Sequence, residues 1–268
     1  MLKYRKNSTG KDHSMKTLLL LAVLAISLTF ASFAQDQGSP SDGSSPYRSK
    51  VKVGGAGGFT PEWGLFNFDG INSALKTAGM PLLKDQPMYL AGGEGYGYIM
   101  FLKNVRMGGC GVTGTVSSTT YDPAANIKKN VDYNVSYGGF LIDYVLPLGG
   151  QVDVAAGVTI GGGGVDVTMS ADNGTYKQWN TLWSQFGQND STINITRHLN
   201  GSFFTLQPHV SVEYAMLRWF QLRVGVSYPY MTGAAWKLED SQDILNVPSN
   251  LKTEGPVVTA GIMFGFFN

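Results

Sequence analysis

The sequence predicts an all-β fold: a closed eight-stranded antiparallel transmembrane β-barrel with one short helix in its first long loop. Three observations support this prediction. Apolar and polar residues alternate along many segments, the connections between these segments are short and long in turn, and charged residues are few. They make up 15% of the 268 residues, against about 25% in an ordinary soluble domain. With 20 basic and 19 acidic residues, there is no basic excess of the kind that binds nucleic acid.

The chain begins with a segment typical of a secretory signal peptide. From Met15 it reads MKTLLLLAVLAISLTFASFAQDQ, a lysine followed by an apolar run that is too short to anchor stably in a bilayer. A small-x-small cleavage site then ends at Ala34, directly before Gln35. We therefore expect residues 1–34 to be a signal peptide with an N-terminal extension, and Met1 and Met15 are alternative starts.

The remaining residues divide into a polar lead and one domain. Residues 35–48 are rich in Ser, Pro and Gly, so they cannot bury an apolar core and are expected to be flexible. Residues 49–268 form the expected barrel. Its strands are predicted at 49–59, 88–100, 104–119, 130–146, 152–169, 200–216, 220–235 and 255–267.

One segment, FDGINSALKTAGM, has the period of a helix instead of a strand. Ile71, Leu75 and Ala78 share one face, Asp69 is the expected N-cap, and Gly79 is the expected stop. The sequence predicts a helix over 69–79, without indicating whether it lies outside the barrel or plugs it.

The connections alternate in length. The second and third strands are joined around FLK, the fourth and fifth around PLGGQ, and the sixth and seventh around LRW, whereas the other links are long. Transmembrane barrels have short periplasmic turns and longer extracellular loops. This alternation therefore favours a membrane barrel over a soluble sandwich.

The two faces of the strands differ in polarity. In 220–235, apolar residues at even positions alternate with Gln221, Arg223, Gly225 and Ser227. In lipid, only a closed barrel satisfies the backbone groups of every strand, so the apolar set is predicted to face lipid. Two aromatic girdles are expected, one near the short turns and one at the other end, from Tyr214, Trp219 and Phe220 and from Tyr228, Tyr230 and Trp236.

The chain resembles the small eight-stranded outer-membrane β-barrels of the OmpA/OmpX type. The resemblance covers 49–268 and includes PHVSVEYAMLRWFQLRVGVSY and the aromatic last strand TAGIMFGFFN. It implies location in the cell outer membrane, contact with outer-membrane lipid and lipopolysaccharide, and recognition by the outer-membrane assembly machinery. It implies no single activity.

His209, Ser211 and Glu213 share one face of one strand, which leaves two interpretations. One is a catalytic triad, resembling barrels that remove acyl chains from lipid A. The other is a hydrogen-bonded network in the lumen. Same-face neighbours on a strand are about 6–7 Å apart, too far for direct contact between nucleophile and base. The network is the favoured interpretation, with no catalytic residues, no metal and no cofactor.

Other charged residues also fall on inward positions. A register that places Met216 opposite Phe220 puts Glu213 opposite Arg223. An eight-stranded barrel is just filled by its side chains, so paired charges would plug the lumen. The further expected members of this network are Glu94, Arg106, Asp143 and Asp153, with Lys52 on the same parity.

The loop 170–199 carries four aromatic residues at three- and four-residue steps: Tyr176, Trp179, Trp183 and Phe186. They predict a short amphipathic helix at headgroup level or a surface that binds a partner. The favoured function is a structural or surface-interaction barrel without enzymatic activity. A narrow channel or small-ligand-binding barrel is the first alternative, and a lipid A acyl hydrolase is the second.

Overall fold

The computed structural model describes residues 54–84, 86–173, 179, 195–248, 251 and 253–267. The predicted signal peptide and polar lead lie outside these residues. So do Tyr176, Trp183 and Phe186, and with them the predicted helix or partner surface of that loop. Among the described residues, no helix is both long and apolar enough to cross a bilayer.

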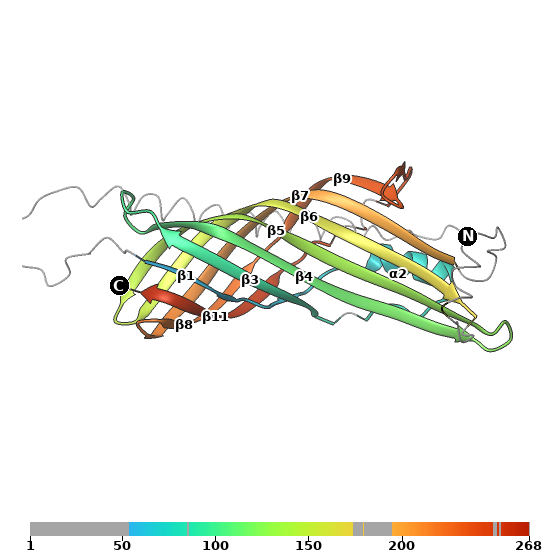
Figure 1. The fold of residues 1–268 in the computed structure, drawn as a ribbon, viewed down its shortest axis with the longest axis horizontal. Coiled ribbons are helices and arrows are strands. Elements are labelled where there is room, and N and C mark those ends of the chain that lie inside the picture. The colour runs from blue at the N-terminus through green and yellow to red at the C-terminus, as the bar shows by residue number, and fades with distance from the viewer. Residues whose placement is uncertain are drawn as a thin grey trace, which may run out of the picture. The chain divides into compact units, whose positions relative to one another are not determined.

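The strands form one antiparallel sheet that closes into an eight-stranded hydrogen-bonded ring, which confirms the predicted fold class (Figure 1). Two of the eight strand positions in the ring are each filled by two shorter strands. β1 and β2 occupy one of these positions, and β8 and β9 occupy the other. The strands are β1 (Gly54–Phe59), β2 (Glu62–Gly64), β3 (Met88–Tyr98), β4 (Val105–Asp122), β5 (Ile127–Gly149), β6 (Val152–Asp172), β7 (Ile195–Leu217), β8 (Phe220–Ser227), β9 (Tyr230–Leu238), β10 (Gln242–Asp243) and β11 (Val257–Phe267).

The ring is closed along only part of its height. Near the short turns, β11 pairs with β8 on one side and with β1 and β2 on the other. Beyond Ser227 the wall continues as β9, which in the described residues pairs with β7 and β10 but not with β11. We call the part near the short turns the closed half. The part where β4 to β7 and β9 continue as a curved sheet is the open half (Figure 1).

A helix, α2 (Asp69–Thr77), covers the inner face of the open half. It begins one residue earlier than predicted, because Phe68 is the N-cap and Asp69, the predicted cap, is already helical. The Asp69 amide instead donates to Asn67 Oδ1 at 2.7 Å. At the other end Gly79 has a left-handed φ of 67°, and the Met80 amide donates to the Leu75 carbonyl at 2.9 Å. This is the glycine-terminated helix end that the sequence predicts.

The helix is held inside the barrel, so it acts as a plug. Ile71 and Leu75 are buried in the main apolar cluster, together with inward residues of β4 to β7 and β9. Ala78, predicted to share their face, is exposed. The Asn72 side chain receives a hydrogen bond from the Leu83 amide at 2.7 Å and donates to the Leu83 carbonyl at 3.1 Å. The hydroxyl of Tyr133, on β5, donates to the carbonyl of Leu251, in the segment between β10 and β11, at 2.6 Å.

The predicted faces are confirmed in the closed half. Val212, Val224 and Val226 on β7 and β8 are 50%, 58% and 59% exposed, whereas inward Arg223 is 4% exposed. Near the short β7–β8 turn, Trp219 stacks on the outward Phe264 with ring centroids 6.2 Å apart. An apolar outer face around a polar interior is the arrangement of a protein that is surrounded by lipid.

Two sequence-based positions are wrong because each lies at a bulge. Trp236 was expected in a girdle but is 8% exposed and packs against Phe203 inside the barrel. The register between β7 and β9 shifts around Phe203, where Gly233 has a φ of 75°, and one extra residue reverses the faces of a strand. A second shift places Leu217, instead of Met216, opposite Phe220. The β4–β5 connection, expected to be long, is a turn over 123–126 because both strands extend further than predicted.

The face assignment can be tested with one charge placed at two heights. Val224→Arg puts a cation against lipid and should cost about 2–4 kcal/mol of folding free energy near the bilayer midplane. Thr115→Arg also points outward but lies in the open half, so it should change stability little. Urea unfolding of both variants in lipid vesicles measures this. Equal costs would contradict the assignment of the lipid-facing surface.

Candidate functional site

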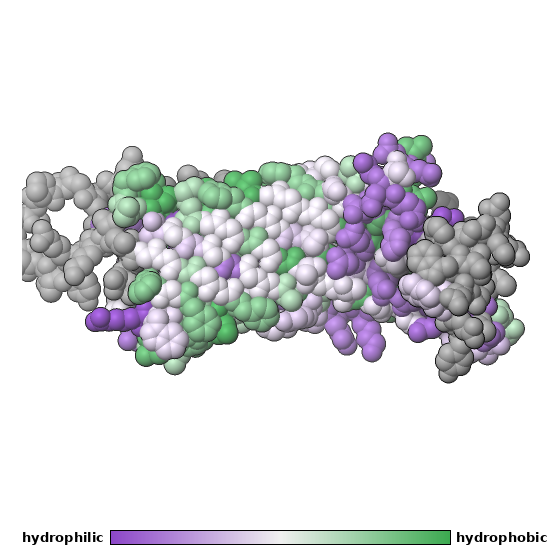
Figure 2. All heavy atoms as spheres, in the orientation of Figure 1, coloured by the Kyte–Doolittle hydropathy of each residue, from purple (hydrophilic) through white to green (hydrophobic). Residues whose placement is uncertain are grey.

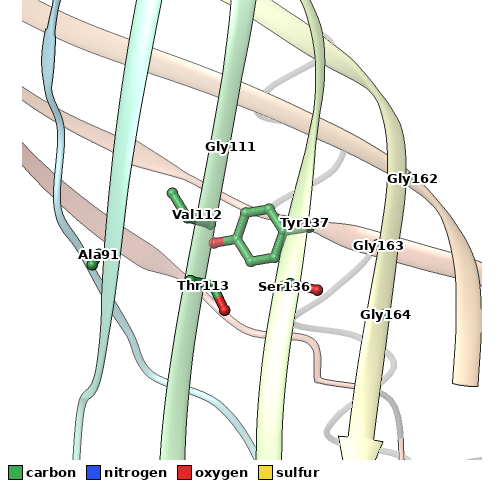
Figure 3. Close-up of a pocket in the computed structure, with 9 residues that line it drawn as sticks. All are labelled: Ala91, Gly111, Val112, Thr113, Ser136, Tyr137, Gly162, Gly163 and Gly164. Atoms are coloured by element: carbon green, nitrogen blue, oxygen red, sulfur yellow. The ribbon is translucent and has the colours of Figure 1, made fainter. Parts of the chain in front are cut away.

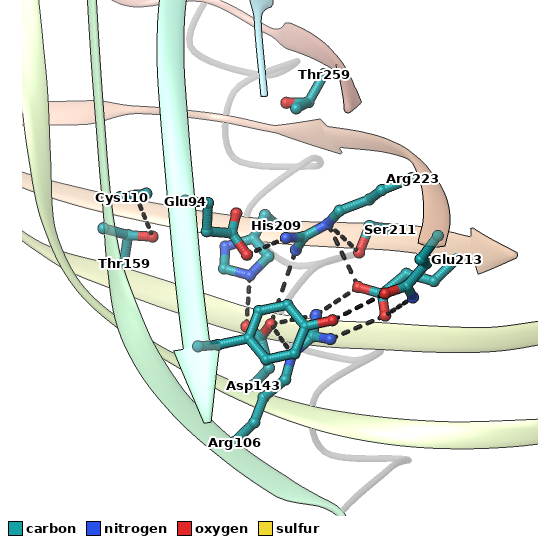
Figure 4. A network of polar contacts seen from close by, with 12 residues as sticks. Glu94, Arg106, Cys110, Asp143, Thr159, His209, Ser211, Glu213, Arg223 and Thr259 are labelled. Carbon is teal, nitrogen blue, oxygen red and sulfur yellow. Dashed lines mark hydrogen bonds and ion pairs between the residues drawn. The ribbon is translucent and has the colours of Figure 1, made fainter. Parts of the chain in front are cut away.

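The lumen of the closed half is filled by an ionic network centred on Arg106 of β4 (Figure 4). This side chain is 0% exposed. Its Nε donates to Asp143 Oδ2 at 2.8 Å, and its two terminal nitrogens donate to the carboxylate oxygens of Glu213 at 2.8 and 2.5 Å. The guanidinium carbon lies 3.8 Å from the centre of the Tyr96 ring. Such a bidentate, charge-assisted pair is among the strongest side-chain interactions in proteins.

A glycine allows two side chains to meet across an intervening strand. Asp143 on β5, Gly157 on β6 and His209 on β7 are paired in register. Asp143 Oδ1 and His209 Nε2 are 2.6 Å apart. A Cβ atom at Gly157 would lie 2.1 Å from Asp143 Oδ1. The contact between Asp143 and His209 therefore depends on the missing side chain between them.

The second arginine joins β8 to the opposite wall of the barrel. Arg223 forms an ion pair with Glu94 of β3 and donates from Nε to Ser211 Oγ at 3.0 Å. Its Nε also lies 3.4 Å from Glu213 Oε1, and its Nη2 lies 3.7 Å from Asp143 Oδ2. The network thus connects β3, β4, β5, β7 and β8, and its charged groups bind one another instead of facing open space.

The arrangement does not assemble the hydrolase geometry. Ser211 Oγ receives its hydrogen bond from Arg223, while the His209 ring bonds to Asp143. Among the described residues, no hydrogen bond joins His209 to Ser211. Glu213, the third member of the hypothetical triad, accepts from Arg106 instead of orienting the imidazole. A nucleophile needs direct contact with its base, and here each of the three has a different partner.

The predicted network residues that the structure describes occupy inward positions, whereas Lys52 lies outside the described residues. Some of the partners were not predicted. Glu213 does lie opposite Arg223, yet Arg106 is its closer partner. Asp153 occupies the inward position paired with Glu213. Tyr96 was not predicted, and Gln221 was placed on the polar face but not in the network. The Tyr96 hydroxyl donates to the Gln221 side chain, whose amide nitrogen donates to Glu213 at 2.7 Å. Alternation identifies a face, whereas these contacts depend on which strands lie opposite each other in the closed ring.

A small cavity lies beside the network and is lined in part by Ser211 and Arg223. Its volume is about 30 Å³, and Glu62, Glu94, Thr159 and His209 are among the residues that line it. A cavity of at least roughly 10–15 Å³ is needed to hold one water molecule, so this space is water-sized. Among the described residues, no group of three or more His, Cys, Asp or Glu side chains is arranged to hold a metal ion.

A second hollow, of about 410 Å³, lies on the outer wall across β3 to β6 (Figure 3). Gly111, Gly162 and Gly164 supply no side chains there, and the hydroxyl-bearing residues Thr113 and Ser136 stand beside them on neighbouring strands. On β5 the hollow reaches Ser136, between the outward apolar Phe140 and the outward polar Asn134. Figure 2 shows hydrophobic residues over the closed half and hydrophilic residues over the open half.

The chain matches no protein-family model and no curated protein. Solved structures of similar shape include a major outer membrane protein from Thermus thermophilus, with 11% identity, a TM-score of 0.44, and coverage of 79% of this chain and 99% of that one. Ail of Yersinia pestis, in complex with the heparin analogue sucrose octasulfate, has 13% identity, a TM-score of 0.34 and coverage of 80% and 98%. OprG of Pseudomonas aeruginosa has 13% identity, a TM-score of 0.36 and coverage of 81% and 97%.

The closed strand ring, its apolar outer face and its charged, filled lumen define the class. The chain is an eight-stranded β-barrel protein of the transmembrane type. This assignment rests on the geometry of the barrel itself, because soluble proteins do not combine an apolar exterior with an ionic interior.

The spacing role of Gly157 gives a direct test of the network. Gly157→Ala should cost about 1–3 kcal/mol through overpacking, because the new methyl group would lie 2.1 Å from Asp143 Oδ1 and 2.2 Å from the Ile142 carbonyl oxygen. Gly162→Ala on the same strand is the matched control, since its Cβ would meet only the Phe203 carbonyl at an ordinary 3.6 Å. Urea unfolding in lipid compares the two. A Gly157→Ala protein as stable as Gly162→Ala would show that the contact across β6 is not needed.

The pairing of Arg106 with Glu213 can be measured by a double-mutant cycle. Glu213→Ala leaves Arg106 buried without its main counter-charge, and breaking a buried pair typically costs about 3–5 kcal/mol. The combined variant Arg106→Met, Glu213→Ala should lose less than the sum of the two single variants, because it contains neither group of the pair. Additive losses would show that the two side chains do not stabilise each other.

Proposed function

We propose that this protein is a plugged, non-conducting outer-membrane barrel with a structural or surface-interaction role and without enzymatic activity. The observation that supports this function best is the double obstruction of its interior. Arg106, Glu213 and their partners fill the lumen of the closed half, and α2 with its apolar cluster fills the open half. Both obstructions take up lumen space that an aqueous path would need.

Conduction is the property that separates this proposal from a narrow channel. We expect the purified protein, reconstituted in planar lipid bilayers, to show no discrete conductance steps, because paired charges occupy the lumen of an eight-stranded barrel. A parallel preparation with Glu213→Ala and Arg106→Met serves as the control for leakage when the network is removed. Reproducible steps from the unmodified protein would favour the channel.

Hydrolysis of lipid is tested at Ser211. Ser211→Ala removes one acceptor of Arg223 and should cost about 0.5–1.5 kcal/mol of stability, with no change in acyl release from lipid A. His209→Ala should likewise leave acyl release at the background level. If the unmodified protein released acyl chains and Ser211→Ala lost that activity while staying folded, the non-enzymatic proposal would be wrong.

Localisation is part of the same proposal. Expressed from Met15, the protein should fractionate with the outer membrane and begin at Gln35, because cleavage follows Ala34. N-terminal sequencing and heat-modifiable gel migration of the membrane fraction test both points. Soluble recovery in the periplasm would contradict the proposal.

A further inference from the structure

His209 adds to the ionic network a side chain that can change its charge. It lies on β7, where its side chain is 10% exposed, in contact with the fully buried carboxylate of Asp143. An unperturbed histidine changes its charge between about pH 5 and 8, where arginine and carboxylate side chains keep theirs. The form of this ring, neutral or doubly protonated, therefore decides the total charge of the network.

Both nitrogens of the His209 ring lie beside oxygen atoms that accept hydrogen bonds. Nε2 is 2.6 Å from Asp143 Oδ1 (Figure 4), and Nδ1 is 3.3 Å from the Gln207 carbonyl oxygen. The other oxygen of Asp143 accepts from Arg106 Nε at 2.8 Å, as a carboxylate does. A neutral imidazole has one N–H and one lone pair, so it would direct the lone pair at one of these two oxygens. The imidazolium donates from both nitrogens.

The balance of charge in the network favours the same form. The ion pairs described above join three carboxylates to two guanidinium groups: Glu94, Asp143 and Glu213 to Arg106 and Arg223. One negative charge is left over, and an uncompensated buried charge is costly. An imidazolium at His209 supplies a third cation, and it does so in direct contact with one of the three carboxylates.

The other titratable groups around the ring increase the negative excess. Glu62 of β2 and Cys110 of β4 line the same cavity as His209, and Tyr137 of β5 donates to Glu62. Asp153 of β6 is paired in register with Glu213, and Tyr96 of β3 lies against the Arg106 guanidinium. Carboxyl, thiol and phenol groups are neutral or negative and never cationic. Ionisation of any of them therefore adds to the need for a cation at His209.

The small cavity beside the network gives the ring a route for its proton. Its volume is about 30 Å³, and His209 is one of the residues that line it. A space of this size holds a water molecule. That molecule can take the proton from the ring when the medium becomes alkaline.

We infer that His209 is held as an imidazolium that joins β7 to β5 across the glycine of β6, and that its deprotonation loosens the closed half. Loss of the proton leaves one of the two facing oxygens without a donor and the network with an unbalanced carboxylate. Stability that depends on a bound proton is present at low pH and is lost as the pH rises past deprotonation. This inference goes beyond the proposed function, since it holds whether or not the barrel meets a surface partner.

The protonation state can be measured directly, because residues 35–268 contain only two histidines, His198 and His209. Protein labelled with nitrogen-15 histidine is folded in detergent micelles and titrated by NMR, and His198→Gln assigns the signals. His198 is exposed and serves as the internal reference. At a pH where His198 has become neutral, both ring nitrogens of His209 should still carry protons. Two neutral rings at that pH would overturn the inference.

Urea unfolding in lipid vesicles, from about pH 5 to pH 9, tests whether this proton stabilises the barrel. His209→Gln keeps a side-chain amide that can donate to Asp143 but cannot gain a charge, and His198→Gln is the matched control. Relative to His209→Gln, the urea midpoints of the unmodified protein and of the control should fall as the pH rises. Parallel profiles for all three proteins would contradict the inference. If His209→Gln does not fold, the titration of the unmodified protein still decides.

The charge balance itself is tested with Glu94→Gln. This change removes one carboxylate, so that the network balances without a third cation. The His209 transition should then move to lower pH by about one unit, a tenfold loss of proton affinity, as removal of a nearby opposite charge implies. A transition that stays where it is in the unmodified protein would show that the excess carboxylate does not hold the proton.

Discussion

A guanidinium group without access to solvent determines how the lumen is built. Arg106 is 0% exposed, and a cation removed from water is stable only when counter-charges and hydrogen bonds surround it closely. Its partners come from β5 and β7. These two strands are not adjacent, so both must lie at fixed heights relative to β4. The same requirement explains the glycine at 157, because a side chain there would occupy the position of the Asp143 carboxylate. The charged groups therefore specify the relative positions of the strands that carry them.

The polarity of β4 to β7 reverses along their length while the alternation of the side chains continues. In the closed half, Asp143 points inward and Phe140 outward; in the open half, Val135 points inward and Asn134 outward. An inner apolar face needs a cover, and α2 supplies it. Near the reversal, glycines of neighbouring strands pair with one another: Gly93 with Gly111, Gly111 with Gly138, and Gly138 with Gly162.

Local pattern in the sequence was sufficient for the strands, their faces and the helix, because alternation and periodicity depend only on neighbouring residues. It failed where one residue is inserted into a strand, as at Gly233, since a single bulge turns Trp236 from the outer face to the core. The choice of Arg106 as the main partner of Glu213 could not be predicted either. That pair spans the lumen between strands far apart in sequence, and its geometry exists only once the ring is closed.

The first strand has a mechanical consequence for the whole ring. Four of the six residues of β1 are glycine, so this strand offers few side chains for the cross-strand contacts that stabilise a sheet, and its backbone loses more entropy on ordering. It pairs with β11 on one side and β3 on the other, and it contains none of the residues of the ionic network. A rupture beside β1 that flattened the ring would separate β3 from β8 and break the ion pair between Glu94 and Arg223. The barrel therefore has a seam at β1 that is held by backbone hydrogen bonds within the wall and by this ion pair across the lumen.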